Sequence, residues 1–143
     1  MALDPSVWGP YYWFFLHTIA ISYPKYPNSI TKKKYYEFIQ NLPMFIPNEN
    51  ISVEFSNLLE SFPVAPYLDC QDAFIRWLHF IHNKINEKLE KPPISLSKFY
   101  ANYYEFYKPK NEKWNDYIKF KQKIIYGVFI FICLFLIYYF YEK

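Results

Sequence analysis

The chain contains 143 residues, of which 52% are hydrophobic and 24% aromatic, and its formal net charge is +3. This length suffices for one domain of ordinary size and leaves no room for a second enzyme-sized core. Only two glycines are present, which excludes most phosphate-binding loops, dinucleotide fingerprints and nucleophile elbows. The charge is mild, so we expect no nucleic-acid partner. The two cysteines, Cys70 and Cys133, are too few for a disulfide framework or a structural zinc site.

Prolines divide the first 107 residues into segments with helical periodicity. Pro10 suits the first turn of a helix over residues 11–23, which Pro24 ends. Thr31 is predicted to cap a second helix that ends near Asn41. The inward face of the first helix is expected to carry Trp13, Leu16, His17 and Ala20.

Three further helices follow in chain order. Asn48 is a good N-cap for the third helix, and Asp69 or Asp72 is expected to begin a long fourth helix that ends at Pro92. Ser95 is predicted to cap a short fifth helix. Apolar residues three or four apart give these helices inward stripes: Ile51, Phe55, Leu58 and Leu59 in the third, Phe74, Trp77, Leu78, Ile81, Ile85 and Leu89 in the fourth, and Leu96, Phe99, Tyr103 and Phe106 in the fifth. No alternating strand pattern accompanies them, so the predicted fold class is an all-α bundle.

An uncharged stretch of eighteen residues begins at Ile124 and ends at Tyr141. As a helix it would be about 27 Å long, close to the roughly 30 Å hydrocarbon thickness of a bilayer. The alternative is a buried core helix, but so small a domain offers no interior for an apolar run of this length. We therefore expect a single-pass tail anchor at residues 124–141, with the membrane as a partner.

Residues 108–123 form a polar, lysine-rich linker between the domain and the apolar stretch. The lysine excess on this side predicts that the N-terminal domain lies on the cytoplasmic side. The first nine residues show no signal-peptide pattern. Six lysines of the linker are also able to attract anionic lipid headgroups, although solubility and topology already account for them: Lys108, Lys110, Lys113, Lys119, Lys121 and Lys123.

Two short segments carry rings and amides at helical spacing. Trp13 and His17 are four residues apart and share one face of the first helix. The fourth helix and the residues after it add His79, His82, Asn83, Asn86 and Lys91. These residues suit a flat heteroaromatic ligand with phosphates. Aromatic rings stack on such a ligand, side-chain amides hydrogen-bond to its polar edges, and a lysine pairs with its negative charge. Histidines satisfied within the core are the structural alternative. We expect no metal, because no carboxylate or cysteine accompanies the three histidines.

In these two segments the chain resembles the FAD-linked sulfhydryl oxidases of the Erv/ALR family. The family motif W-G-x-x-x-W-x-x-L-H is close to the segment with Trp8, Gly9, Trp13, Leu16 and His17. The signature H-N-x-[VI]-N-x-x-L-x-K-P is matched by His82, Asn83, Ile85, Asn86, Leu89, Lys91 and Pro92. The resemblance implies a four-helix bundle with a short fifth helix over residues 1–107, and an FAD cofactor. The FAD-binding residues that it implies are Gly9, Tyr12, Trp13, His17, His79, His82, Asn83, Asn86, Leu89 and Lys91.

The family's redox-active Cys-x-x-Cys pair has no counterpart at its expected place. In the family a substrate dithiol reduces this pair, which lies at a helix N-terminus and passes electrons to FAD and then to oxygen. Here Asn48 and Ile51 occupy the two positions, and neither side chain exchanges electrons with a thiol. We therefore expect no catalytic residue. Cys70 is a poor substitute, because the chain offers it no resolving partner.

Three functional hypotheses follow. The first is a membrane-anchored degenerate oxidase that keeps FAD and has a binding or structural role. The second is an active thiol oxidase that forms disulfides with oxygen as acceptor and takes cysteines from a partner chain. The third is a membrane scaffold without a cofactor. The retained amides and histidine argue against the third hypothesis, and the loss of both cysteines argues against the second.

The resemblance also bears on setting and partners. Small members of the family occur in mitochondria and in large DNA viruses of eukaryotes, and the Lys, Ile, Asn, Tyr and Phe content is typical of an AT-rich genome. We expect a component of a viral membrane or virion, with viral structural proteins as partners. Family members dimerise through their first helices, so Tyr11, Phe14 and Phe15 are a candidate homodimer interface. Packing of these aromatic residues within the monomer explains them equally well.

Overall fold

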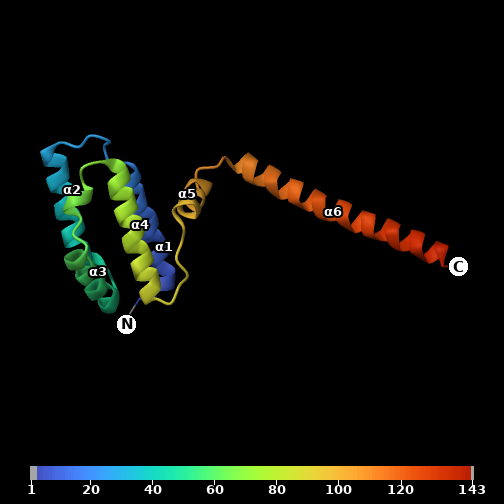
Figure 1. Cartoon of the computed structure of the whole chain (residues 1–143), viewed down its shortest axis with the longest axis horizontal. Helices are drawn as coiled ribbons and strands as arrows, with labels where there is room; N and C mark the ends of the chain where they lie inside the picture. The colour runs from blue at the N-terminus through green and yellow to red at the C-terminus, as the bar shows by residue number, and fades with distance from the viewer. Residues whose placement is uncertain (1–2, 143) are drawn as a thin grey trace. The chain divides into compact units, whose positions relative to one another are not determined.

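The computed structural model describes residues 3–142, and residues 110–113 by their backbone alone. Every regular element within this range is a helix, which confirms the all-α prediction (Figure 1). The α-helices and the short 3-10 helices η1 and η2 follow in the order α1 (Pro5–Ile21), α2 (Ser29–Asn41), η1 (Leu42–Phe45), α3 (Glu49–Ser61), η2 (Ala65–Tyr67), α4 (Gln71–Lys88), α5 (Leu96–Glu105) and α6 (Lys110–Tyr141). The chain divides into two compact units, Met1–Ala101 and Asn102–Lys143.

The core of the first unit lies around α4. This helix packs along α1 and against α3 (Figure 1). The predicted apolar stripe of α4 is buried from Phe74 to Ile85, with Phe74, Leu78 and Ile81 fully enclosed, whereas Leu89 lies just beyond the helix and is half-buried. Tyr23, just beyond α1, is also buried, and its hydroxyl donates to Leu68 O at 2.8 Å. Because α1 and α4 pack side by side, polar residues on their shared faces are brought together.

Two of the predicted helix starts are confirmed. Asn48 precedes α3, and its Oδ1 accepts from Ile51 N at 3.1 Å. Ser95 precedes α5, and its Oγ accepts from Lys98 N at 3.2 Å. In both places a short polar side chain satisfies a backbone N–H of the first turn, which is the reason such residues begin helices.

Three other predicted starts are wrong. α1 begins at Pro5, earlier than predicted, because Asp4 accepts from Ser6 N and a proline follows in the first turn; Pro10 lies inside the helix. α2 is capped by Asn28, whose Oδ1 accepts from the backbone N of Thr31 at 2.8 Å. α4 begins at Gln71, so neither predicted aspartate caps it.

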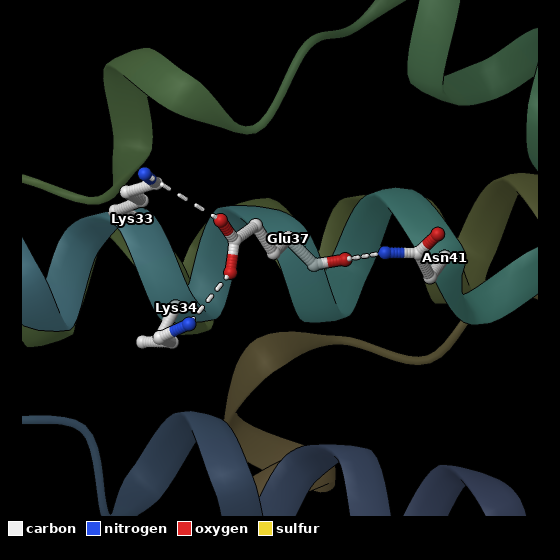
Figure 2. A network of polar contacts seen from close by, with 4 residues as sticks. All are labelled: Lys33, Lys34, Glu37 and Asn41. Atoms are coloured by element: carbon white, nitrogen blue, oxygen red, sulfur yellow. Dashed lines mark hydrogen bonds and ion pairs between the residues drawn. The ribbon is translucent and has the colours of Figure 1, made fainter.

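The exposed side of α2 carries a small polar network (Figure 2). Glu37 pairs with Lys34 at 3.1 Å and with Lys33 at 4.0 Å, and its carbonyl oxygen accepts from Asn41 Nδ2 at 2.7 Å. Pairs of this kind at three or four residues apart support a helix by a few tenths of a kcal/mol, about 0.2–0.5 each. The network therefore stabilises α2 locally.

The second unit contains α6, which runs without interruption from Lys110 to Tyr141. The linker is thus helical from residue 110 onward, and the side chains of Lys110 and Lys113 lie outside the described residues. Within Trp114–Tyr141 a window of 18 residues has a mean hydropathy of 2.4 and none of it is buried, so this stretch is long and apolar enough to cross a membrane. Phe106 was predicted to face inward but is 71% exposed, because α5 ends at Glu105 and the helical spacing ends with it.

Candidate functional site

Rings from α1 and α4 form a stacked cluster. The Trp13 indole and the His82 imidazole lie with centroids 3.9 Å apart and planes 10° from parallel. His17 Nε2 and His82 Nδ1 are 3.0 Å apart, within hydrogen-bond distance. The two sequence motifs therefore lie side by side, because α1 and α4 pack against each other. We refer to Trp13, His17 and His82 as the Trp–His cluster.

Both histidines of the cluster are neutral at pH 7. Burial, with smaller contributions from the nearby His82 and His79, lowers the pKa of His17 to about 3. Burial also lowers the pKa of His82 to about 4, with smaller contributions from His79 and Lys91. The main cause is common to both rings: removing the charged form of a histidine from water is unfavourable.

One atom of the cluster is buried without a partner. His17 is 3% exposed, and its Nδ1 has no hydrogen-bond partner among the described residues. In the hydrogen bond between the histidines one ring donates and the other accepts. If His17 donates from Nε2, its Nδ1 is an acceptor without a donor, and in the other tautomer it is a donor without an acceptor. Buried polar atoms are nearly always satisfied, so this one suits a polar ligand group.

Asn83 and His79, which the resemblance implies as FAD-binding residues, contact the loop that leads to α5. Asn83 Oδ1 accepts from Ile94 N at 2.8 Å, and Asn83 Nδ2 donates to Ile94 O at 2.9 Å. His79 Nε2 lies 2.8 Å from the same carbonyl oxygen. In α5, the Phe99 ring lies with its centroid 4.3 Å from that of His17. The first turn of α5 is thus placed beside the Trp–His cluster.

The end of α4 carries the remaining implied residues of this motif. Asn86 is buried, and its carbonyl oxygen accepts from Lys91 N at 2.8 Å. This hydrogen bond caps the C-terminal end of α4. It requires Glu90 to adopt a φ of 55°, in the left-handed region that favours glycine. Leu89 is half-buried, and Lys91 is exposed.

A cavity of about 610 Å³ lies at this end of α4. Its lining includes Asn48 and Ile51 from the start of α3 and Ile85, Lys88 and Leu89 from the end of α4. Ile85 and Leu89 follow His82 by three and seven residues, so they lie one and two turns further along the same helix. Asn48 and Ile51 therefore face a cavity of ligand size.

In the motif on α1, Trp13 and His17 belong to the Trp–His cluster, whereas Trp8, Gly9 and Tyr12 do not. The hydroxyl of Tyr12 donates to Phe45 O at 2.9 Å, and the Tyr12 ring meets the Trp8 ring edge to face. The space where a side chain of Gly9 would extend is open for 4 Å. The observed contact of Tyr12 therefore joins α1 to η1.

Neither cysteine pairs with another in the part of the chain that the structure describes. Cys70 is exposed just before α4, and Cys133 lies in α6. Among the described residues, no group of three histidine, cysteine, aspartate or glutamate side chains is arranged to hold a metal ion.

Three contributors to this site were not predicted as site residues from the sequence. Phe99 was predicted as core, and its contact with His17 depends on the path of the loop between α4 and α5. The Ile94 peptide group takes part through backbone atoms, which leave no signal in residue type. Lys88 at the cavity was not singled out either, although its place one turn before Pro92 provided a hint.

Comparison with known proteins places this geometry in a family. A sequence model of the Erv1 / Alr family matches residues 10–105. Over 85 residues the chain is 28% identical to a probable FAD-linked sulfhydryl oxidase of Acanthamoeba polyphaga mimivirus, covering 59% of each protein. Over 104 residues it is 29% identical to the mitochondrial FAD-linked sulfhydryl oxidase ERV1 of Saccharomyces cerevisiae, covering 73% of this chain and 48% of that protein. The chain thus spans about half to three fifths of the length of these two relatives.

Solved structures agree. The crystal structure of the FAD binding domain of Erv1 from Saccharomyces cerevisiae matches 72% of this chain and 96% of that chain, with a TM-score of 0.65 and 25% identity. The crystal structure of the yeast Erv1 core matches 65% of this chain and 77% of that chain, with a TM-score of 0.60 and 28% identity.

Proposed function

This chain belongs to the Erv1 / Alr family, and we propose that it is a membrane-anchored member that keeps the FAD site but has lost the oxidase chemistry. The observation that carries the proposal is the cavity beside α4, which Asn48 and Ile51 line. The relatives are FAD-linked sulfhydryl oxidases by name, and a related domain binds FAD. This chain presents an amide and an aliphatic side chain at the redox positions.

The residues present fit an FAD cofactor. The Trp–His cluster offers flat rings in parallel, and His17 Nδ1 is a buried polar atom that lacks a partner among the described residues. Burial keeps both histidine rings uncharged, so they stack and hydrogen-bond without an additional positive charge. We assign Trp13, His17 and His82 to binding the flat rings of FAD. We assign Lys91, which is exposed, to pairing with the negative charge of FAD at the edge of the site.

The missing step is electron transfer from a thiol. FAD supplies, when bound, a two-electron acceptor that reacts onward with oxygen in this family. A thiolate is needed to deliver electrons to it, and the thiolate is the reactive form of cysteine. Asn48 has instead a structural task, because its Oδ1 caps α3 at Ile51 N. The fold is thereby maintained while the electron path is absent.

Restoring the pair tests this proposal. The double variant Asn48→Cys/Ile51→Cys in the full chain, purified in detergent, is expected to gain dithiol-dependent oxygen consumption. The matched control is Asn57→Cys/Glu60→Cys, which places the same spacing on exposed positions of α3 away from the cavity lining. The proposal fails if the unmodified chain oxidises dithiols as fast as the restored variant, or if both double variants behave alike. The first outcome would favour an active oxidase.

We further infer that α6 anchors the protein, with the first unit on the cytoplasmic side. Lys119, Lys121 and Lys123 precede the uncharged stretch, and positive residues flank such stretches on the cytoplasmic side. Cys70 is exposed and reports the orientation. A membrane-impermeant maleimide is expected to label Cys70 only after the membrane is permeabilised. Labelling in sealed cells, at the rate seen after permeabilisation, contradicts this orientation.

A viral setting and a homodimer complete the proposal. Relatives occur in viruses, including mimivirus and Invertebrate iridescent virus 3, and we infer a place in a viral membrane or particle. Tyr11 and Phe15 of the predicted interface are 75% and 55% exposed, whereas Phe14 is half-buried. Val7, one turn before Tyr11 on α1, is 67% exposed and extends this exposed apolar stripe, which supports a second copy as partner. Light scattering of Tyr11→Lys/Phe15→Lys is expected to give a monomer where the unmodified chain gives a dimer. A monomer in both contradicts the dimer.

A further inference from the structure

The side-chain amide of Asn83 is already engaged by the chain itself. Its Oδ1 accepts from Ile94 N at 2.8 Å, and its Nδ2 donates to Ile94 O at 2.9 Å. The amide therefore pairs with the backbone N–H and C=O of one residue through two hydrogen bonds, as residues of neighbouring strands pair. We refer to this pairing as the Asn83–Ile94 clasp.

A second side chain of α4 supports the clasp. His79, one helical turn before Asn83, has its Nε2 2.8 Å from Ile94 O. A carbonyl oxygen has two lone pairs and is able to accept from both donors, so His79 carries its proton on Nε2. One face of α4 thus fixes the backbone N–H and C=O of Ile94 with three hydrogen bonds.

The fixed backbone of Ile94 determines where α5 begins. Ile94 stands next to Ser95, whose Oγ accepts from Lys98 N at 3.2 Å and whose carbonyl oxygen accepts from Phe99 N at 2.8 Å. Phe99 is 6% exposed, and its ring centroid is 4.3 Å from that of His17 and 5.8 Å from that of His79. Phe99 therefore covers His17 and contributes to the burial that keeps this histidine uncharged.

We propose that Phe99 is a wall of the cofactor site and that Asn83 is a positioning residue, which holds this wall in place through Ile94. The inference rests on the proposed FAD binding and deepens it. It gives Asn83 a task other than direct contact with the cofactor, because its carbonyl oxygen and one of its amide hydrogens are occupied by Ile94. It also adds Phe99 to the residues that exclude water from the Trp–His cluster.

Two measurements on the full chain in detergent test the inference. Hydrogen exchange with mass spectrometry reports the protection of residues 92–99 in the FAD-free protein, and the recovery of flavin fluorescence reports the rate of FAD release. The variants are Asn83→Ala, Asn83→Asp, Phe99→Ala and the more conservative Phe99→Leu. Asn57→Ala is the matched control, because Asn57 is exposed on α3.

The two kinds of variant are expected to separate the two roles. Asn83→Ala removes two hydrogen bonds, so exchange in residues 92–99 rises and FAD release becomes roughly tenfold faster. Asn83→Asp keeps an acceptor for Ile94 N but loses the donor, and is expected to increase exchange in the same segment. Phe99→Ala is expected to speed FAD release while the exchange of Ile94 stays as in the unmodified chain. A general loss of stability would raise exchange throughout α2, α3 and α4 instead.

Several outcomes overturn the inference, and they are distinguishable. If Asn83→Ala releases FAD faster with unchanged exchange in residues 92–99, its amide acts on the cofactor directly. If the Asn83 and Phe99 variants release FAD at the unmodified rate, this inference fails and the proposed FAD binding stands. If the unmodified chain takes up no FAD, both fail together. Phe99→Leu and Asn83→Asp keep the test decisive if an alanine variant does not fold.

Discussion

Mild acid is expected to destabilise the first unit through the Trp–His cluster. In the folded protein burial lowers the pKa of His17 to about 3 and that of His82 to about 4, whereas both have an ordinary value of 6.5 in an unfolded chain. Below pH 6.5 the unfolded chain therefore binds protons that the folded chain does not. The free energy of unfolding is at its full value above pH 6.5 and falls as the pH is lowered toward these folded-state pKa values.

The size of the effect follows from the separation of the pKa values. Each histidine that is protonated in the unfolded chain but neutral in the folded one lowers the free energy of unfolding by about 1.4 kcal/mol per pH unit below 6.5. Between pH 7 and pH 5 the two histidines together account for a loss on the order of 4 kcal/mol. This is a large part of the roughly 5–15 kcal/mol that stabilises a typical domain. Most carboxylates titrate below this range, so they contribute little to it.

Urea unfolding at a series of pH values is the assay. Tryptophan fluorescence of the full chain in detergent gives the free energy of unfolding at pH 7, 6 and 5. The variant His17→Phe/His82→Phe keeps aromatic rings but cannot bind protons at these positions, and its free energy is expected to change much less. Asn57→Ala, an exposed substitution on α3, is expected to keep the full pH dependence. An equal pH dependence in the double phenylalanine variant would refute the reasoning.

Three stability predictions follow from single contacts, each measured by the shift of the urea midpoint. Glu90→Gly is expected to stabilise the protein by about 1 kcal/mol, because glycine adopts the positive φ of this residue without strain; a loss of stability would show that the Glu90 side chain matters more. Asn48→Ala is expected to cost about 1 kcal/mol through loss of the cap on α3, and Asn48→Asp much less; equal effects would contradict the capping role. Phe74→Ala is expected to cost about 3–5 kcal/mol because the ring is fully buried, and a cost below 1 kcal/mol would mean that the core closes around the gap.

Local signals in the sequence predicted the helices better than their starts. The apolar stripe of α4 as far as Ile85 and the caps at Asn48 and Ser95 depend on neighbouring residues, and they were predicted correctly. Asn28 and Thr31 are both good caps three residues apart, and the residue types do not decide between them. The backbone conformation does: Asn28 is extended, and its side chain accepts from Thr31 N.

The candidate site was only partly predictable for a different reason. Helical spacing placed Trp13 beside His17 and His82 beside Asn86, each on its own helix. The stacking of Trp13 on His82 depends on how α1 packs on α4, which spacing alone does not determine. The hydrogen bonds of Asn83 with the backbone of Ile94 depend on the path of the loop between α4 and α5. The left-handed conformation of Glu90 occurs without the glycine that usually signals it in a sequence.

The most direct test of the account is the visible absorption spectrum of the full chain, purified in detergent, before and after a dithiol is added without oxygen. The account predicts a flavin spectrum at stoichiometric FAD that the dithiol does not bleach, because in the proposed site Asn48 and Ile51 replace the thiols that would deliver electrons. A folded protein that stays colourless with added FAD would contradict the cofactor site. A flavin that the dithiol bleaches rapidly would contradict the loss of the electron path.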